Sequence, residues 1–426
     1  MNRISHTSMA ELPERAVKGS PLRMVAAGLM LAAGACILAF AISGSDAANR
    51  DYVSYWAAGQ QLVHHGNPYD SEAVLRLERA AGLVGQQPLL MRNPPLAFVL
   101  TLPLGLVSVR VGAIVWSLAL VAALMASIRM LWIVQGRPRD RLYLAGYVFP
   151  PALACLLAGQ VGIFLLLGVT LFLFLHRSRP SLAGASLLLC ALKPHLFLPC
   201  GIVLVAWIVL RKAYPILLGA AAALLASLAL LLFLNAGIWS QYAHGERAEN
   251  IQNLFIPCLS VLLRIAIDRN ALWIQALPEL AGCAWAIWYF WKRRERWSWV
   301  DHGALLLLVS VMVAPYAWFT DEVLLLPAIL AGLYRSLNAG RSFVPFGCIA
   351  GVALIEVLAG VPLASGLYVW TAPAWLAWYL YAIRGMEPSG ADPAEHEVRD
   401  DRGLPQERSV AGGLHARPVS RKPAVG

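Results

Sequence analysis

The chain has 426 residues, of which 59% are hydrophobic and only 14% are charged. Soluble globular proteins have roughly 45–50% apolar and about 25% charged residues, so this composition excludes an ordinary soluble protein. The formal net charge of +10 is typical of nucleic-acid binding or of a membrane protein. Because the basic residues lie in short loops between apolar runs, as the positive-inside rule requires, we expect membrane lipids and no nucleic acid as partners.

The apolar runs are long enough to cross a hydrocarbon core about 30 Å thick as helices. Lipid offers the backbone no hydrogen-bond partners, so spans must be helices or a closed barrel, and the alternating pattern of barrel strands is absent. The sequence therefore predicts an all-α polytopic membrane protein. Its seven cysteines show no spacing typical of a metal site.

We predict a cytoplasmic segment over 1–21, a multi-span membrane domain over 22–384 and a disordered cytoplasmic tail over 385–426. The domain is predicted to contain about 12 spans. These are expected at about 22–43, 111–134, 142–157, 161–175, 181–193, 196–210, 213–235, 271–290, 303–317, 323–337, 343–362 and 366–384.

The first outer loop, residues 45–93, is the longest polar interruption in the chain. It contains DYVSYWAAGQQLVHHG and SEAVLRLERAAGLV, whose helical spacing predicts short amphipathic helices on the outer membrane surface. Residues 94–110 are apolar but short and contain three prolines. If they crossed the membrane, the later basic clusters would face outward, so we predict a re-entrant or interfacial segment.

With this topology, the polar segments between spans converge on the outer side, which predicts a functional site there. Asp51, followed by aromatic residues, is a candidate general base or a helix N-cap. Lys193 lies in an apolar context before a helix-breaking proline, and His195 adds a second polar group. Together they predict an anion site for a lipid phosphate, with snorkelling of the lysine as the alternative.

Other polar residues at the outer boundaries are candidates for contacts with a substrate. Gln160 and Asn253 suit sugar hydroxyls or plain interfacial solvation. Asp321 suits an acid that supports the residues in contact with substrate, a hydroxyl contact, or the N-terminus of a helix. Trp56 and Trp318 suit stacking on a sugar or an aromatic belt at the membrane surface.

Several segments together resemble glycosyltransferase family 87. DYVSYWAAGQQLVHHGNPYD resembles the first outer loop of that family, and RNPPLAFVLTLPLGLVS resembles its Tyr-Pro-Pro-Leu segment, with Arg92 and Asn93 replacing the usual aromatic residue. AGQVGIFLLL resembles its Gly-Gln-Val-Asn run, with Gly162 in place of asparagine. ALKPHLFLP and IQNLFIPCLSVLLR resemble its Lys-x-x-Pro element and its Asn-containing outer loop.

This resemblance implies a GT-C fold with an active site on the outer face and a polyprenyl-phosphate-linked sugar as donor. By position, Asp51 matches the catalytic acid that acts as base, and Lys193 matches a basic residue near the donor phosphate. Many members carry Ser-Trp-x-His-His near the end of the site. Here that stretch is Ala-Trp-Phe-Thr-Asp, so both histidines are lost and Asp321 is a candidate replacement for one of them.

We therefore expect a multi-pass enzyme of the bacterial cytoplasmic membrane that transfers a hexose, with mannose implied, to a lipid or glycan acceptor on the periplasmic face. Asp51 is the expected base, and Lys193, His195 and Arg92 are expected to bind the donor phosphate. No metal or cofactor is expected, because the leaving group is already an anion. The alternatives are a transporter or flippase of lipid-linked glycans and an inactive scaffold. The expected substrate-binding residues are Tyr55, Trp56, Gln160, Asn253, Trp318 and Asp321.

Overall fold

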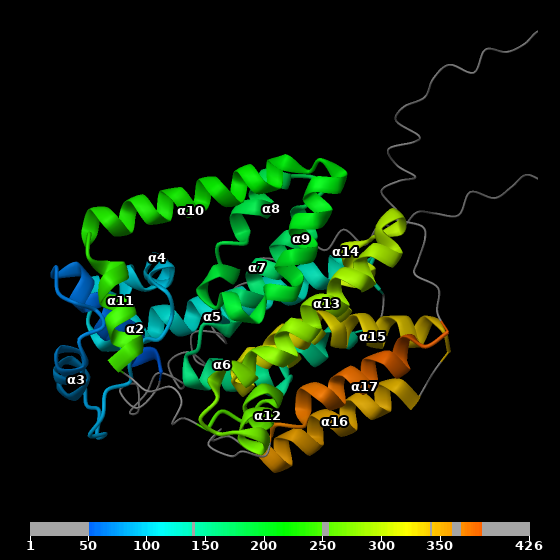
Figure 1. Cartoon of the computed structure of the whole chain (residues 1–426). Helices are drawn as coiled ribbons and strands as arrows, with labels where there is room; N and C mark the ends of the chain where they lie inside the picture. The colour runs from blue at the N-terminus through cyan, green and yellow to red at the C-terminus, as the bar shows by residue number, and fades with distance from the viewer. Residues whose placement is uncertain (1–50, 139–140, 249–254, 341–342, 360–367, 386–426) are drawn as a thin grey trace, which may run out of the picture. The chain divides into compact units, whose positions relative to one another are not determined.

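The computed structural model describes residues 51–385, apart from 139–140, 249–254, 341–342 and 360–367. Within these residues every regular element is a helix, as Figure 1 shows, which confirms the predicted all-α class. The α-helices are α2 (Tyr52–Val63), α3 (Ser71–Ala80), α4 (Phe98–Thr101), α5 (Val109–Val134), α6 (Pro150–Ala158), α7 (Gly162–Leu175), α8 (Pro180–Ser186), α9 (Leu198–Arg211), α10 (Tyr214–Leu234), α11 (Ile238–Ala248), α12 (Leu259–Ile267), α13 (Ala276–Arg293), α14 (Trp299–Val313), α15 (Leu326–Asn338), α16 (Phe343–Ala359) and α17 (Thr371–Ile383). The 3₁₀ helices are η2 (Pro95–Ala97), η3 (Leu102–Leu106), η4 (Leu142–Tyr147), η5 (Cys190–Leu192), η6 (Pro194–Leu196), η8 (Leu272–Gln275), η9 (Arg294–Arg296) and η10 (Phe319–Leu325).

Two of the described helices, α5 and α10, are long and apolar enough to cross a bilayer. At 1.5 Å per residue, the 26 residues of α5 extend about 39 Å. Leu217, Leu218, Leu225 and Phe233 of α10 are exposed, as expected for a helix that faces lipid. The predicted first span and the two predicted termini lie outside the described residues. The other predicted spans form shorter helices, so their number stays a prediction.

Two of the predicted spans are interrupted. The segment 142–157 consists of η4 and α6, and the segment 181–193 consists of the seven-residue α8 followed by tight turns. Proline explains the first interruption, because a proline disfavours the α conformation in the residue before it, and Pro150 begins α6. In the second segment, tight turns follow α8 from Leu187, and Lys193 leaves the helical conformation (φ −143°, ψ 72°) directly before Pro194. Hydropathy shows that a segment is apolar, but it does not show whether its helix is continuous.

Helix α2 is buried within the protein on most sides and is not an exposed amphipathic helix, which corrects this part of the prediction made for it. Nine of its 12 residues are buried, and it packs against η3 and α5. Its backbone approaches η3 so closely that a Cβ atom at Gly59 would lie 2.7 Å from the carbonyl oxygen of Thr101. By contrast, α3 is amphipathic as predicted, and the side chain of Asp70 caps its N-terminus. Figure 1 shows α2, α3 and α4 together at one end of α5.

The segment 94–110 is folded back onto the protein. It forms η2, α4 and η3 in succession, and these elements contact α2 and α10. This apolar helical stretch, Pro95–Leu106, is about 20 Å long at the rise of α and 3₁₀ helices. That length is shorter than a hydrocarbon core of about 30 Å, but α7 and α14 are also shorter, so the re-entrant interpretation stays a prediction.

Candidate active site

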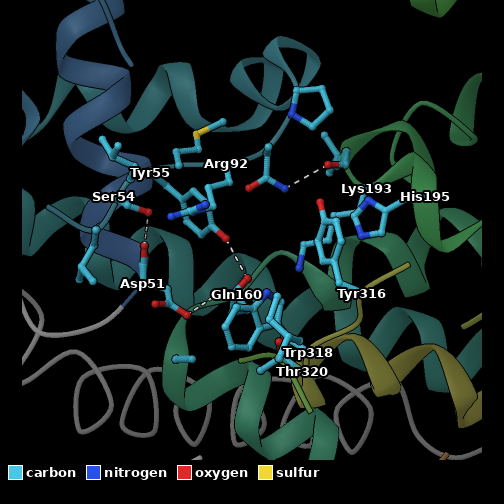
Figure 2. A pocket seen from close by; sticks show the side chains of 18 of the residues that line it. Asp51, Ser54, Tyr55, Arg92, Gln160, Lys193, His195, Tyr316, Trp318 and Thr320 are labelled. Carbon is cyan, nitrogen blue, oxygen red and sulfur yellow. Dashed lines mark hydrogen bonds between the residues drawn. The ribbon is translucent and has the colours of Figure 1, made fainter. Parts of the chain in front are cut away.

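A cavity of about 450 Å³ lies where α2, the segment 88–94, the turn 192–195 and the start of η10 meet. Its volume is within the range of about 300–1,000 Å³ that is typical of sites for small ligands. Figure 2 shows polar side chains that enter it from α2 on one side and from the turn 192–195 on the other. The predicted site residues that line it are Asp51, Tyr55, Arg92, Gln160, Lys193, His195 and Trp318.

Asp51 directly precedes α2, but its carboxylate does not cap the helix. Its Oδ2 instead accepts a hydrogen bond from Gln160 Nε2, as Figure 2 shows. The hydroxyl of Ser54 donates to the main-chain carbonyl of Asp51 at 2.7 Å and closes the first turn. The N-cap interpretation of Asp51 is therefore wrong, because its carboxylate is directed toward the cavity.

Gln160 owes its position to the end of α6. Gly159 ends this helix in the left-handed region (φ 73°), which favours glycine, and its carbonyl accepts a hydrogen bond from Trp116 Nε1 at 2.7 Å. The Tyr55 hydroxyl donates to Gln160 Oε1 at 2.9 Å, while the amide nitrogen donates to Asp51. Burial, and then the charge of Asp51, raise the pKa of the Tyr55 phenol, so it remains a donor. Gln160 thus uses both ends of its amide to orient Asp51.

Lys193 and Asp321 form a buried ion pair, with 2.6 Å between Nζ and Oδ1. Lys193 is 8% exposed and Asp321 is fully buried. The other carboxylate oxygen of Asp321 accepts a hydrogen bond from the main-chain N–H of Trp318 at 3.0 Å. Lys193 therefore does not snorkel. Asp321 is the counter-ion behind the cavity wall and caps the start of η10, in agreement with the helix N-terminus interpretation. It does not line the cavity, so the predicted direct contact with substrate is not supported.

His195 contributes a polar group but not a second charge. Its ring packs on that of Tyr316, with 4.0 Å between the ring centroids. Its Nε2 atom is buried and has no hydrogen-bond partner among the described residues. Burial lowers the pKa of His195 to about 4, so the imidazole is neutral at pH 7.

Of the predicted substrate contacts that the structure describes, Trp56 does not line the cavity. Trp56 is 8% exposed and donates from Nε1 to the carbonyl of Val107 at 2.9 Å, so it belongs to the core. Asn253 lies outside the described residues. Trp318 lines the cavity and is 38% exposed, so it remains available for stacking.

Several cavity residues were not predicted from the sequence. Asn93 donates from Nδ2 to the carbonyl of Leu192 at 3.0 Å, and its own carbonyl accepts a hydrogen bond from Tyr69 at 3.1 Å. These bonds tie the first outer loop to the turn that contains Lys193. Asn93 could have been predicted from the sequence, because it directly follows Arg92, which is a predicted site residue. Thr320 and Tyr368, which also line the cavity, carry no comparable sequence signal.

The described residues contain no cluster of three or more histidine, cysteine, aspartate or glutamate side chains that could hold a metal ion. Comparison with curated proteins and with solved structures gives no match. The model of glycosyltransferase family 87 matches residues 92–315, which is more than half of the chain. The matched range contains Arg92, Gln160, Lys193 and His195, whereas Asp51 precedes it and Asp321 follows it. With its spanning-length helices and this match, the chain belongs to glycosyltransferase family 87 and is a membrane glycosyltransferase.

Proposed function

We propose that the protein transfers a hexose, with mannose as the expected sugar, from a polyprenyl-phosphate donor to a lipid or glycan acceptor. The observation that carries the proposal is that the carboxylate of Asp51 and the ammonium of Lys193 line one cavity. Each is held by a partner, the carboxylate of Asp51 by the half-buried Gln160 and the ammonium of Lys193 by the buried Asp321. A site with an oriented acid and an oriented cation suits a displacement with an anionic leaving group.

In the proposed reaction, Asp51 accepts the proton of the acceptor hydroxyl. The acceptor oxygen then forms a bond to the anomeric carbon, while the bond from that carbon to the phosphate oxygen breaks. Because attack comes from the face opposite the phosphate, the configuration inverts, as in inverting glycoside chemistry. Gln160 and Tyr55 keep the carboxylate oriented for proton transfer.

The departing polyprenyl phosphate gains negative charge as its bond to the sugar breaks. Lys193 and Arg92 line the cavity and supply positive charge for this group. His195 is neutral, so its proposed part is a hydrogen bond from the ring and not charge compensation. Trp318 and Tyr55 are the proposed contacts for the sugar and the acceptor.

The all-helical architecture supports a GT-C fold as part of the proposal. In the proposed topology, residues 22–384 form the membrane domain of a protein in the bacterial cytoplasmic membrane. The cavity then faces the periplasm, because α2 and the turn 192–195 belong to outer segments. The basic loops face the cytoplasm in this arrangement.

The test is sugar transfer by the purified full-length protein in lipid nanodiscs. A panel of polyprenyl-phosphate hexoses serves as donors, with lipid extracts and glycans as acceptors. Asp51→Asn is compared with Asp70→Asn, a matched substitution in the same loop at an exposed helix cap, where Asn caps as well as Asp. We expect transfer from one donor, a loss of roughly 10²–10⁴-fold in Asp51→Asn and little change in Asp70→Asn.

Equal transfer by Asp51→Asn and the wild type would remove Asp51 from the mechanism. No transfer by folded wild-type protein from any donor would contradict the polyprenyl-phosphate donor. Movement of the intact donor across a vesicle membrane, unchanged in Asp51→Asn, would support a transporter. Neither transfer nor movement would support an inactive scaffold.

A further inference from the structure

The ends of α9 and α13 carry a dense group of basic residues, which we call the basic patch. It consists of Arg211, Lys212, Lys292, Arg293, Arg294 and Arg296. All of them are exposed except Arg294, which is half-buried. Glu295 is the only acid in these two stretches of sequence, and the next acid along the chain, Asp301, is paired with Arg335. The basic patch therefore carries a large local excess of positive charge.

Main-chain contacts hold the two helix ends together. The guanidinium of Arg211 donates hydrogen bonds to the main-chain carbonyls of Arg294 at 3.2 Å and of Glu295 at 2.7 Å. Both carbonyls belong to η9, which directly follows α13. The two bonds come from the same nitrogen, Nη2, whereas an arginine has five N–H donors on three nitrogens. Arg211 can therefore join the two helices and still bind an anion.

Two tryptophans of α13 indicate the depth at which the basic patch meets the membrane. Trp288 and Trp291 are exposed and lie one turn apart on the helix. The ammonium of Lys292 lies 4.5 Å from the ring centroid of Trp288, and the guanidinium carbon of Arg294 lies 4.7 Å from that of Trp291. Tryptophans in membrane proteins are enriched at the level of the lipid headgroups. We therefore expect the cations that stack on these rings to lie at the level of the lipid phosphates.

Exposed apolar side chains adjoin the basic patch on both helices. Val205 and Val209 belong to α9, and Leu280 and Ile287 belong to α13. A ligand at the basic patch thus meets cations and, directly beside them, exposed hydrocarbon. This combination fits an amphipathic anion, because a soluble anion or a nucleic acid would leave the apolar surface uncovered.

General topology accounts for part of this charge. Basic residues are favoured in the loops on one side of a membrane, and a cation in the last turn of a helix interacts favourably with the helix dipole. Neither effect requires the ends of two helices to be joined through Arg211, or the cations to stack on exposed tryptophans. Clusters of four to eight lysines and arginines beside a spanning helix are typical of sites for anionic lipids.

We propose that the basic patch is a binding site for the headgroup of an anionic phospholipid, whose acyl chains lie along the exposed apolar faces of α9 and α13. The phosphate accepts hydrogen bonds from the exposed cations, and Trp288 and Trp291 contact the glycerol region of the lipid. This site is separate from the cavity, so the proposal does not depend on the donor or acceptor of the proposed function.

Charge-neutral substitutions test the site, and the chain offers matched controls. The patch variant combines Lys212→Gln, Lys292→Gln and Arg296→Gln, and it leaves the bonds of Arg211 in place. The control variant removes the same charge from three exposed residues elsewhere, by Arg76→Gln, Arg110→Gln and Arg269→Gln. A charge-preserving variant combines Lys212→Arg, Lys292→Arg and Arg296→Lys. Comparison of the three separates local charge from net charge and from the identity of the side chains.

The measurement is the ligand-induced shift of the melting temperature of the full-length protein in a neutral detergent. The probes are phosphatidylglycerol, phosphatidylcholine with the same acyl chains, and glycerol 3-phosphate. We expect phosphatidylglycerol to stabilise the wild type, the control variant and the charge-preserving variant at lower concentrations than phosphatidylcholine. The patch variant should need roughly 100-fold more phosphatidylglycerol, because each cation near a lipid surface contributes about fivefold in affinity. Its response to phosphatidylcholine should be unchanged.

Salt provides a second readout of the same interaction. An increase from about 0.1 M to about 1 M sodium chloride shortens the screening length from about 10 Å to about 3 Å. It should therefore weaken the binding of phosphatidylglycerol more in the wild type than in the patch variant. If the patch variant is unstable without lipid, the three single substitutions serve in its place, and each should lose about fivefold.

Four outcomes would overturn the proposal. Equal responses of the wild type to phosphatidylglycerol and phosphatidylcholine would exclude a site for an anionic headgroup. Losses of equal size in the patch and control variants would assign the effect to net charge. Wild-type affinity in the patch variant would show that its cations do not bind the lipid. Glycerol 3-phosphate that acts at the same concentration as phosphatidylglycerol would indicate a site for a small soluble anion.

Discussion

The ammonium of Lys193 lies 2.6 Å from Oδ1 of Asp321, so the cation of the cavity already has a buried counter-ion. Removal of one member leaves the other charge buried and unpaired. We expect Asp321→Asn and Lys193→Met each to reduce the free energy of unfolding by about 3–5 kcal/mol. The double variant should lose less than the sum, because neither charge remains. The measurement is the apparent melting temperature in detergent, with all four proteins compared.

A second ion pair provides the control. Arg335 and Asp301 are bound to each other away from the cavity, with side chains that are 20% and 12% exposed. Asp301→Asn should lower the melting temperature without altering donor affinity, whereas Asp321→Asn should alter both. Full wild-type stability in Asp321→Asn would show that the ion pair contributes nothing.

The amide of Gln160 is hydrogen-bonded to both Asp51 and Tyr55. A carboxylate in place of this amide would therefore change the pKa of Asp51, the proposed base. In Gln160→Glu, two like charges lie side by side, and one of them retains a proton to higher pH. Because the base acts only when deprotonated, the acidic limb of the pH–kcat/KM profile should move to higher pH. Gln86→Glu, at an exposed residue bonded to Arg79, is the control and should leave the profile in place. An unmoved profile in Gln160→Glu would separate Gln160 from the base.

Glu78 of α3 makes stability depend on pH. Its Oε2 accepts a hydrogen bond from the Leu89 N–H at 3.0 Å, and burial raises the pKa of its carboxyl from 4.5 to about 7. Between these pH values the folded protein retains a proton that the unfolded chain releases, so stability falls as pH rises from about 4.5 to 7. Glu78→Gln keeps the acceptor and removes this dependence. We expect it to be more stable than the wild type at pH 8, by up to about 3 kcal/mol, and similar at pH 4.5.

The comparison is the melting temperature at both pH values. Glu72→Gln, at an exposed residue of the same helix, should follow the wild type at each pH. If Glu78→Gln shows the same pH dependence as the wild type, the buried carboxyl is not its source.

The contact of α2 with η3 depends on two glycines. A Cβ atom at Gly105 would overlap the carbonyl of Gly59 and lie 2.8 Å from the main-chain nitrogen of Gln60. Gly105→Ala should therefore push α2 away from η3, lower stability by roughly 1–3 kcal/mol and reduce transfer, because Asp51 precedes α2. Gly201→Ala in α9 is the control. Its Cβ would meet nothing within 4 Å, so it should be neutral or stabilising by up to about 1 kcal/mol. A stable, fully active Gly105→Ala would contradict the close contact.

The sequence was sufficient to predict the helical class and the residues around which the cavity forms. A charged or polar residue beside an apolar run costs free energy unless a partner or a function offsets it. This made four site residues recognisable: Asp51, Arg92, Lys193 and His195. From the sequence, the charge of the loops predicts that these residues lie on the same side of the membrane. The structure shows that they line one cavity.

The burial of α2 and of Trp56 could not be read from the sequence. An aromatic helix at the end of a span fits a membrane surface as well as a protein core, and the difference lies in contacts with η3, more than 40 residues away. Thr320 and Tyr368 were missed for a related reason. A single hydroxyl in an apolar run has no pattern, and its place at the cavity wall appears only when distant segments enclose the same cavity.

The bond from Asn93 to the carbonyl of Leu192 joins segments 99 residues apart in sequence. Arg92 directly precedes Asn93, and Lys193 directly follows Leu192, so the bond sets the spacing of the two cations when the chain folds. A flexible protein would have to gather these charges around an incoming anion, and its affinity would be lower by that reorganisation free energy. Here the two main-chain segments are joined during folding, so a ligand meets Arg92 and the Lys193–Asp321 ion pair already on neighbouring segments, with less reorganisation left to make.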